Sequence, residues 1–351
     1  MSGKNKPKAS NKTPWFILVW TLVTLLSYTG PLLNPQLFGF AIAVLLIYPL
    51  VLIANLFFLI FYSYRAKFKS AVWVLFIVLA GYPIHSKPIA VSTSIAVPEK
   101  TDLKVVTFNA NYGLSLMGDD TDGEDFIPLL KETRKPDIWL LQEHTPELEK
   151  WLTNRIEFEN RVHRENYRTA IYTDYEVVRS GLIPFGNLEN SCIWADLKID
   201  DQQIVRVYNI HLQSNRVTDH SRKLAEDGLD WRSPDFQTFL TILRNYNSAS
   251  AKRVGQVDQL LEHLRQSPYP AVIGGDINDV PISYIYRRLA RGRTDSFIQS
   301  GRGFGTTYMG AIPLLRIDCV FVEKEIKVIR HDLISGRFSD HKPLVVWLRL
   351  P

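Results

Sequence analysis

The stretch that decides the fold is Ala271-Val272-Ile273-Gly274-Gly275-Asp276-Ile277-Asn278-Asp279. Its short apolar run predicts a buried strand, and the glycines and polar side chains that follow mark where this strand reaches a polar edge. Carboxylates packed so closely are costly to bury unless they hold a cation or a proton. By itself the pattern also suits an ordinary turn, so its meaning depends on the other strands of the chain.

Other strand-like runs end in side chains of the same kind. The polar residues that end, follow or precede these runs are Asn109, Asn111, Gln142, Glu143, His211, Asp276, Asn278, Asp318, Asp340 and His341. If the strands are neighbours in packed sheets, these side chains converge at one sheet edge. Acids, amides and two imidazoles in one place are what metal-assisted phosphoryl chemistry requires.

Short β-branched or aromatic runs recur through the C-terminal two thirds of the chain. They predict strands over 104–108, 138–141, 169–173, 176–183, 192–199, 203–210, 271–273, 317–322 and 344–350. Helical periodicity predicts helices over 126–135, 147–155, 236–246 and 254–266. Many strands with interspersed helices indicate an α/β domain of about 250 residues, in which helices cover two packed sheets.

Charge divides the chain into two unlike parts. The 351 residues carry a formal net charge of +5, but residues 1–98 hold eight Lys and Arg and no acid. The remainder holds 33 basic and 36 acidic residues, a net charge of −3. The basic character of the chain therefore belongs to its N-terminal part and does not indicate a nucleic-acid-binding surface on the rest.

The N-terminal part is predicted to be a membrane anchor. Between Lys12 and Arg65 lie 52 consecutive residues without a formal charge, enough for two spans, which we place at about residues 14–33 and 37–62. A third apolar stretch, 70–86, is near the short limit for a span. The alternative for the first segment is a cleavable signal peptide.

These segments predict three regions: an anchor with three spans over 1–86, a linker over 87–100 and a globular domain over 101–351. Basic residues precede the first span and lie between the second and third, and the loop between the first two is uncharged. The positive-inside rule then predicts an integral protein of the inner or plasma membrane, with its globular domain on the extracytoplasmic side. If 70–86 only lies on the membrane, the domain faces the cytoplasm and an intracellular nucleic acid or nucleotide becomes the substrate.

Six dispersed motifs of the globular domain resemble the endonuclease/exonuclease/phosphatase superfamily. They are Thr-Phe-Asn-Ala-Asn at 107–111, Leu-Leu-Gln-Glu at 140–143, Asn-Ile-His-Leu at 209–212, Gly-Gly-Asp-Ile-Asn at 274–278, Arg-Ile-Asp at 316–318 and Ser-Asp-His-Lys-Pro at 339–343. Their order and approximate spacing match across the whole domain. The resemblance implies a deoxyribonuclease-I-like, four-layer α/β sandwich, two mixed sheets flanked by helices, here preceded by transmembrane helices. It also implies metal-dependent hydrolysis of phosphoric esters.

The resemblance implies a metal site. Glu143 is expected to be the principal ligand, with Asn109 and Asp340 near the same ion. Carboxylate and amide oxygens favour Mg²⁺, or Mn²⁺, over Zn²⁺. Asn111 stands where several nucleases of the family carry an aspartate, and its neutral amide favours single-metal chemistry.

The resemblance also implies catalytic roles. Asp276 is expected to orient or deprotonate the attacking water, and Asn278 to position the phosphate. His341 is expected to contact the phosphate, held by a carboxylate such as Asp318. His211 is expected to donate to a non-bridging oxygen or to assist the leaving group.

The expected substrate is a phosphodiester, either in nucleic acid or in a phospholipid headgroup. Basic and aromatic residues between His211 and Gly274 suit both, although an amphipathic helix explains them equally well. The rival hypothesis is a catalytically silent module that binds a phosphorylated ligand at the membrane. No protein partner follows from the sequence, and Asp279 is interpreted as a turn or capping residue.

Overall fold

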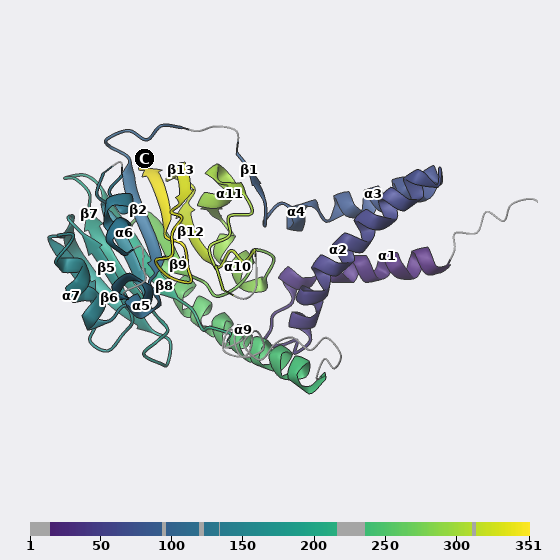
Figure 1. The fold of residues 1–351 in the computed structure, drawn as a ribbon, viewed down its shortest axis with the longest axis horizontal. Helices are drawn as coiled ribbons and strands as arrows, with labels where there is room; N and C mark the ends of the chain where they lie inside the picture. Colours follow the sequence, from purple (N-terminus) through teal and green to yellow (C-terminus); the bar gives the residue numbers. More distant parts are fainter. Residues whose placement is uncertain (1–14, 93–95, 119–122, 133, 216–235, 311–313) are drawn as a thin grey trace, which may run out of the picture.

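The computed structural model describes residues 15–92, 96–118, 123–132, 134–215, 236–310 and 314–351. Apolar helices at the N-terminal end adjoin a larger α/β body (Figure 1). The basic residues before the first predicted span, and much of the basic and aromatic segment after His211, lie outside the described residues.

Two six-stranded sheets build the body. The first has the order β10 (Arg293–Asp295), β12 (Asp318–Glu323), β9 (Ala271–Asp276), β8 (Ile204–His211), β7 (Ser191–Lys198) and β6 (Glu176–Pro184). The second has the order β13 (Lys327–Leu333), β14 (Leu344–Arg349), β2 (Leu103–Asn109), β3 (Ile138–Gln142), β5 (Thr169–Thr173) and β4 (Asn160–His163). The predicted α/β class with two packed sheets is confirmed.

Each sheet contains one parallel pair among antiparallel neighbours, so both sheets are mixed. β2 runs parallel to β3, and β8 runs parallel to β9 with His211 opposite Asp276. The antiparallel pairing of β12 with β9 places Asp318 opposite the same aspartate. Parallel neighbours end at the same edge of a sheet, so the polar residues that end these strands come together.

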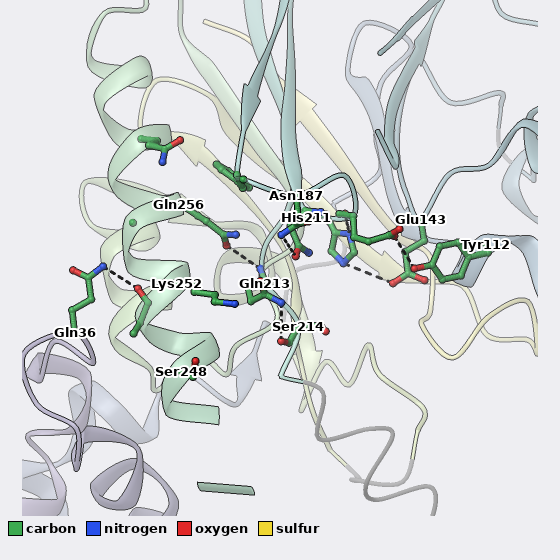
Figure 2. A pocket seen from close by; sticks show the side chains of 17 residues that line it. Gln36, Tyr112, Glu143, Asn187, His211, Gln213, Ser214, Ser248, Lys252 and Gln256 are labelled. Carbon is green, nitrogen blue, oxygen red and sulfur yellow. Dashed lines mark hydrogen bonds and ion pairs between the residues drawn. The ribbon is translucent and has the colours of Figure 1, made fainter. Parts of the chain in front are cut away.

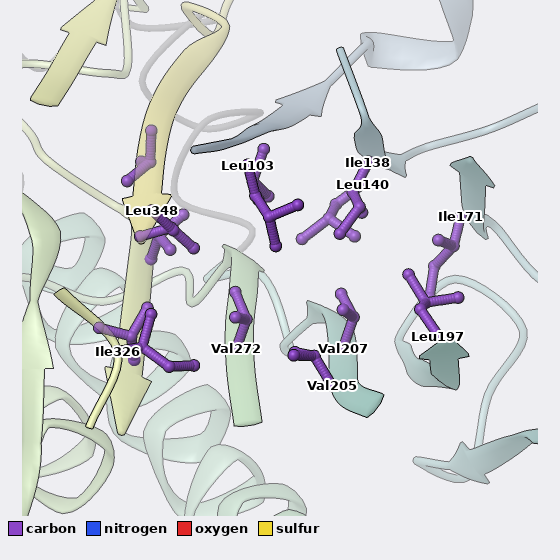
Figure 3. Packing of buried hydrophobic residues seen from close by; sticks show 14 of the residues in the cluster. Leu103, Ile138, Leu140, Ile171, Leu197, Val205, Val207, Val272, Ile326 and Leu348 are labelled. Atoms are coloured by element: carbon purple, nitrogen blue, oxygen red, sulfur yellow. The ribbon is translucent and has the colours of Figure 1, made fainter. Parts of the chain in front are cut away.

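Three apolar clusters separate four layers. Between the sheets, side chains such as Leu140, Val207 and Val272 form a buried apolar cluster (Figure 3). A second cluster lies between the outer face of the β2 sheet and the helices α6 (Gly123–Leu130) and α7 (Pro146–Thr153). A third lies between the β9 sheet and the helices α9 (Phe236–Arg265) and α10 (Tyr284–Ala290). The result is the expected sandwich.

The segment predicted to be a membrane anchor, called the anchor below, comprises α1 (Trp15–Ser27), the 3₁₀ turn η1 (Gly30–Leu32), α2 (Ala41–Tyr64), α3 (Phe68–Ala80) and α4 (Tyr82–His85). Two segments, Trp15–Leu32 and Ala41–Tyr64, are long and apolar enough to cross a membrane by length and composition. α3 is shorter, with 13 residues, so the third span over 70–86 stays a prediction.

The anchor packs directly on the body. Ile42 and Tyr48 of α2 are buried in a cluster with Ile282, which follows β9 in the chain. The Nε2 of Gln36, in the turn between η1 and α2, donates a hydrogen bond of 2.9 Å to the carbonyl oxygen of Ala251 in α9. The turn between α1 and α2 therefore lies beside the body, and the turn between α2 and α3 lies at the far end (Figure 1).

Part of the predicted linker is also bound to the body. β1 (Ala90–Val91) pairs with β11 (Arg302–Gly303). The Arg316 guanidinium donates to the carbonyl oxygen of Lys87 at 3.2 Å. β11 directly follows α11 (Ser296–Ser300) in the chain. These contacts hold the start of the linker against the edge of the body.

Candidate active site

Asp276, the last residue of β9, lies at the centre of the site. Its Oδ2 accepts hydrogen bonds from the Nδ2 atoms of Asn109 (3.1 Å) and Asn278 (3.2 Å), and its Oδ1 accepts one from the Asn278 backbone N–H (2.8 Å). Burial and the negative charge of Asp318 raise the pKa of Asp276 to about 6, although His341 and His211 act in the opposite direction. The carboxylate is thus fixed in orientation and less acidic than an exposed aspartate.

Glu143 is joined to this carboxylate through one amide. The Nδ2 of Asn109 lies 3.1 Å from Glu143 Oε1 as well as 3.1 Å from Asp276 Oδ2. Two carboxylates therefore converge on a single NH₂ group, which offsets little of their mutual repulsion. This is an environment that a divalent cation stabilises.

The backbone at the site is strained. Glu143 has a φ of 54° and Asn278 a φ of 51°. Both values lie in the left-handed region, which residues other than glycine rarely adopt. Each such residue costs about 1–3 kcal/mol and persists only where the surrounding structure imposes it. The strain aims both side chains into the site.

His341 and Asp318 form a buried pair. The Nδ1 of His341 lies 2.8 Å from Asp318 Oδ2, and its Nε2 lies 3.9 Å from Asp276 Oδ2. Burial opposes the imidazolium, but the charge and the hydrogen bond of Asp318 outweigh it and raise the pKa of His341 to about 10. The Oδ1 of Asp318 is buried without a hydrogen-bond partner among the described residues.

His211 is oriented by a backbone carbonyl group. Its Nδ1 donates to the carbonyl oxygen of Glu189 at 2.9 Å, because a carbonyl can only accept. Its Nε2 lies 3.7 Å from Glu143 Oε1 and 3.8 Å from Asp276 Oδ2. The two imidazoles therefore present their Nε2 atoms to the same carboxylate oxygen.

The group Asp276, Asp318 and His341 could hold a metal ion, since one ligand atom from each lies within 4.8 Å of the others. The ligands expected from the sequence form a different group, centred on Glu143, and the two groups meet at the hydrogen bond between Asn109 and Asp276. The oxygen-rich donors and the unpartnered Oδ1 of Asp318 fit a hard divalent cation.

Asp340 lies at the periphery of these contacts. The Oγ of Ser339 lies 3.2 Å from Asp340 Oδ1 and 2.8 Å from the carbonyl oxygen of Asn109. Among the described residues, Asp340 is thus connected to Glu143 through Ser339 and Asn109. Its role as a metal ligand stays a prediction.

Asn278 lies in the site, but its amide is already engaged. The Nδ2 atom donates to the carbonyl oxygen of Leu212 at 2.9 Å and to Asp276 Oδ2 at 3.2 Å. Its observed contacts fix the aspartate, and its predicted part in positioning phosphate stays a prediction. Asn111 donates its backbone N–H to Asn109 Oδ1 at 3.1 Å.

Asp279 is more than the turn residue that the sequence suggested. Its Oδ2 lies 3.2 Å from the guanidinium of Arg253 in α9, and its Oδ1 accepts a hydrogen bond of 2.8 Å from the hydroxyl of Tyr246. The Arg253 side chain is fully buried. The ion pair between Arg253 and Asp279 connects the loop after β9 to α9. The sequence around Arg253 does not distinguish this buried arginine from an exposed arginine on a helix.

A groove of about 900 Å³ leads away from the site. Glu143 and Tyr112 line one end, and Gln36 of the anchor turn lines the other (Figure 2). The residues Lys252, Gly255 and others of α9 form its long wall. The groove therefore runs from Glu143 and His211 to the turn between η1 and α2.

A four-layer sandwich that gathers carboxylates, amides and two imidazoles at its strand ends defines a phosphoric ester hydrolase. The model of the Endonuclease/Exonuclease/phosphatase family matches residues 106–341, and the chain belongs to this family. The resemblance of the six motifs and the assignment as a phosphoric ester hydrolase are confirmed.

Solved structures share the fold at low identity. A humanized TDP2 from D. rerio is 18% identical with a TM-score of 0.51, and a functionally unknown conserved protein from Enterococcus faecalis V583 is 16% identical with a TM-score of 0.52. A mannosyl-6-phosphatase from Bacteroides thetaiotaomicron VPI-5482 is 17% identical with a TM-score of 0.50. Each match covers 71% of this chain and 100% of the other. A search of curated proteins finds no match.

Proposed function

We propose that the chain is a membrane-tethered phosphodiesterase that depends on Mg²⁺, or Mn²⁺, and hydrolyses a phosphodiester of a nucleic acid or a phospholipid headgroup. The observation that carries the proposal is the amide of Asn109 between the carboxylates of Glu143 and Asp276. Two imidazoles face the same oxygen of Asp276. This arrangement suits attack of water on a phosphate held between acids and imidazoles.

The residues that would hold the cation are Glu143, Asn109 and Asp340. When bound, the cation supplies positive charge to the phosphoryl oxygens, which become more negative in the transition state. The adjoining carboxylates of Asp276 and Asp318 would add to the negative potential that retains it.

The side chains of the site then have separate tasks. Asp276 accepts a hydrogen bond from the attacking water, because the hydrogen bonds from Asn109 and Asn278 hold its carboxylate in one orientation. His341 donates from Nε2 to a phosphoryl oxygen while its Nδ1 is held by Asp318. His211 donates to a second phosphoryl oxygen or to the leaving group.

The arrangement of the anchor is consistent with a body on the extracytoplasmic side. The uncharged turn between α1 and α2 adjoins the body. The turn between α2 and α3, with Arg65 and Lys67 and with Lys69 following at the start of α3, lies at the far end (Figure 1). With the basic turn in the cytoplasm, α3 and α4 return the chain to the opposite side. A reporter fused after Pro351 tests this, and a cytoplasmic signal would overturn the proposed topology.

The test measures hydrolysis of bis(4-nitrophenyl) phosphate by the full chain in detergent, with Mg²⁺, Mn²⁺ or EDTA added to the buffer. We expect turnover only with a divalent cation. Glu143→Gln should raise the Mg²⁺ concentration for half-maximal activity by about tenfold or more, because one ligand charge is lost. The exposed Glu325→Gln is the matched control.

Two outcomes would count against the proposal. A folded chain that hydrolyses no phosphate ester with any divalent cation would refute it. Binding of a phosphorylated ligand by both the wild type and Asp276→Ala, without turnover by either, would instead support a silent binding module.

A further inference from the structure

The groove beside the active site is completed by the membrane anchor. Gln36 lines it and is held there by its hydrogen bond to the carbonyl oxygen of Ala251 at 2.9 Å. The family model matches only residues 106–341. The wall that Gln36 contributes is therefore an addition to the part of the chain that defines the family.

The end of the groove at Gln36 adjoins residues suited to a bilayer surface. Leu37, Phe38 and Phe40 follow in the chain and are 75%, 40% and 58% exposed. Exposed aromatic and aliphatic side chains at the end of an apolar helix pair are typical of the membrane–water interface. A ligand that fills the groove thus reaches from the catalytic residues to the level of the lipid headgroups.

As lined by the described residues, the groove is mainly polar. Eight of these 17 residues are Asn, Gln or Ser. The charged residues among the 17 are Glu143, Glu189 and Lys252, with His211 at the end near Glu143. A nucleic acid needs several cations along its backbone, whereas the described lining offers one lysine and two acids. Amides and hydroxyls instead suit a neutral group that carries several hydroxyls.

We propose, on the basis of the function proposed above, that the substrate is a bilayer phospholipid with one phosphodiester and an uncharged, hydroxyl-bearing headgroup. The phosphate lies at Glu143, Asp276 and the two imidazoles. The headgroup lies in the groove between α9 and Gln36, which makes Gln36 a specificity-determining residue. The lipid tails remain in the membrane beside the anchor.

Gly255 provides a sharp test of the groove. Gly255 lines the groove, and outside its own helix a Cβ atom added there would have Gln36 Nε2, at 3.8 Å, as its neighbour, so a larger side chain fits beside Gln36. Gly255→Met should block the headgroup position while replacing a weak helix former in α9. Gly255→Ala is the graded control because its methyl group leaves the groove open.

The full chain is reconstituted in phosphatidylcholine vesicles that contain phosphatidylglycerol or phosphatidylinositol. For both Gly255→Met and Gln36→Ala, the ratio of lipid turnover to bis(4-nitrophenyl) phosphate turnover should fall about tenfold or more. Gln36→Ala removes one or two hydrogen bonds to the headgroup, and Gly255→Met occupies its place. Gln202→Ala, in the exposed hairpin between β7 and β8, should leave the ratio unchanged.

Parallel assays use water-soluble glycerophosphoglycerol and a single-stranded oligonucleotide. The inference would be overturned if the oligonucleotide were hydrolysed faster than phosphatidylglycerol and phosphatidylinositol, or if phosphatidylcholine were hydrolysed as fast as these two lipids. It would also be overturned if Gly255→Met lowered lipid turnover and bis(4-nitrophenyl) phosphate turnover equally. If the wild type hydrolyses bis(4-nitrophenyl) phosphate but no lipid, this inference alone fails. If it hydrolyses no diester with Mg²⁺, the proposed function fails as well.

Discussion

The imidazole of His341 is tied to Asp318 by a hydrogen bond of 2.8 Å between Nδ1 and Oδ2. Asp318 begins β12 of one sheet, and His341 lies in the segment that leads into β14 of the other. The hydrogen bond therefore fixes the ring across the junction of the two sheets. It also directs Nε2 toward Asp276.

Asp318→Asn should lower kcat by roughly 10² with little change in KM. The amide keeps the shape of the carboxylate but removes the charge that favours the protonated, donating imidazole. Steady-state kinetics with bis(4-nitrophenyl) phosphate measures this, and circular dichroism verifies the fold. A variant with wild-type kcat would show that the pair only supports the structure.

Gly275→Ala should prevent normal folding. Gly275 has a φ of +143°, and an added Cβ would lie 1.9 Å from the carbonyl oxygen of Ile210 on the neighbouring strand. That distance is far inside van der Waals contact, so β8 and β9 would have to separate. The yield of monodisperse protein and its thermal unfolding measure the effect.

Gly292→Ala is the matched control for this substitution. Its φ is +79°, but a Cβ there has no neighbour within 4 Å. Only the conformational cost of about 1–2 kcal/mol remains. Equal loss of stability in the two variants would contradict the steric explanation.

Arg253→Met should lower the free energy of unfolding by about 3–5 kcal/mol, because it leaves the buried Asp279 without its ion partner. The variant also removes donors to the carbonyl oxygen of Gln213 and to Asn215 Oδ1. Denaturant unfolding of the detergent-solubilised chain measures the change. Combining it with Asp279→Asn should cost less than the sum of the two single changes, and strict additivity would show that the ion pair is not coupled.

Asp102→Asn should alter stability in a pH-dependent way. The hydrogen bonds from Arg349, 2.7 and 3.0 Å long, lower the pKa of Asp102 despite its burial. A carboxylate with a depressed pKa stabilises the fold above its unfolded pKa of about 3.9, and the contribution is lost as the pH falls through the folded pKa.

The difference in unfolding free energy between wild type and Asp102→Asn should therefore be full near pH 7 and should shrink below about pH 4. The exposed Asp125→Asn serves as the control. A difference that stays constant from pH 7 to acid would show that the charge of Asp102 contributes nothing.

The sequence predicts the interior strands and their polar ends because both signals are local. The run 271–273 corresponds to β9, and the run 104–108 to β2, with boundaries that differ by a few residues. Such strands are buried on both faces, so they read as continuous apolar segments. Asn109 comes directly after the run 104–108, Glu143 comes shortly after the run 138–141, and packing of the sheets brings them to one place.

Two edge strands of one sheet, β4 and β13, were not predicted from the sequence, whereas the edge strand β6 of the other sheet was. In β4 the exposed Arg161 and His163 flank the buried Val162, and in β13 polar residues such as Arg330 and Asp332 interrupt the apolar ones. Polar side chains protect an edge from pairing with other chains, but they also remove the apolar signal. The residues 160–163 and 327–333 therefore resemble loops.

The structure also joins two predicted helices. The sequence indicated separate helices over 236–246 and 254–266, but α9 is continuous from Phe236 to Arg265. The interruption consists of weak helix formers such as Asn247 and Ser248. Tertiary packing overrides their preference, since Val254, like the following apolar residues, is buried against the β9 sheet. The contact of α9 with Gln36 depends on this long-range packing and has no local signal.

The packing of Ile42 and Tyr48 on Ile282 has a practical consequence for protein engineering. A fragment cut at the start of β2 would expose Ile282 and the side of α9 that α2 covers, and such an apolar patch promotes self-association. A version of the protein without the N-terminal helices would therefore need polar replacements on this surface. These helices shield part of the α/β body from water, whatever else they do.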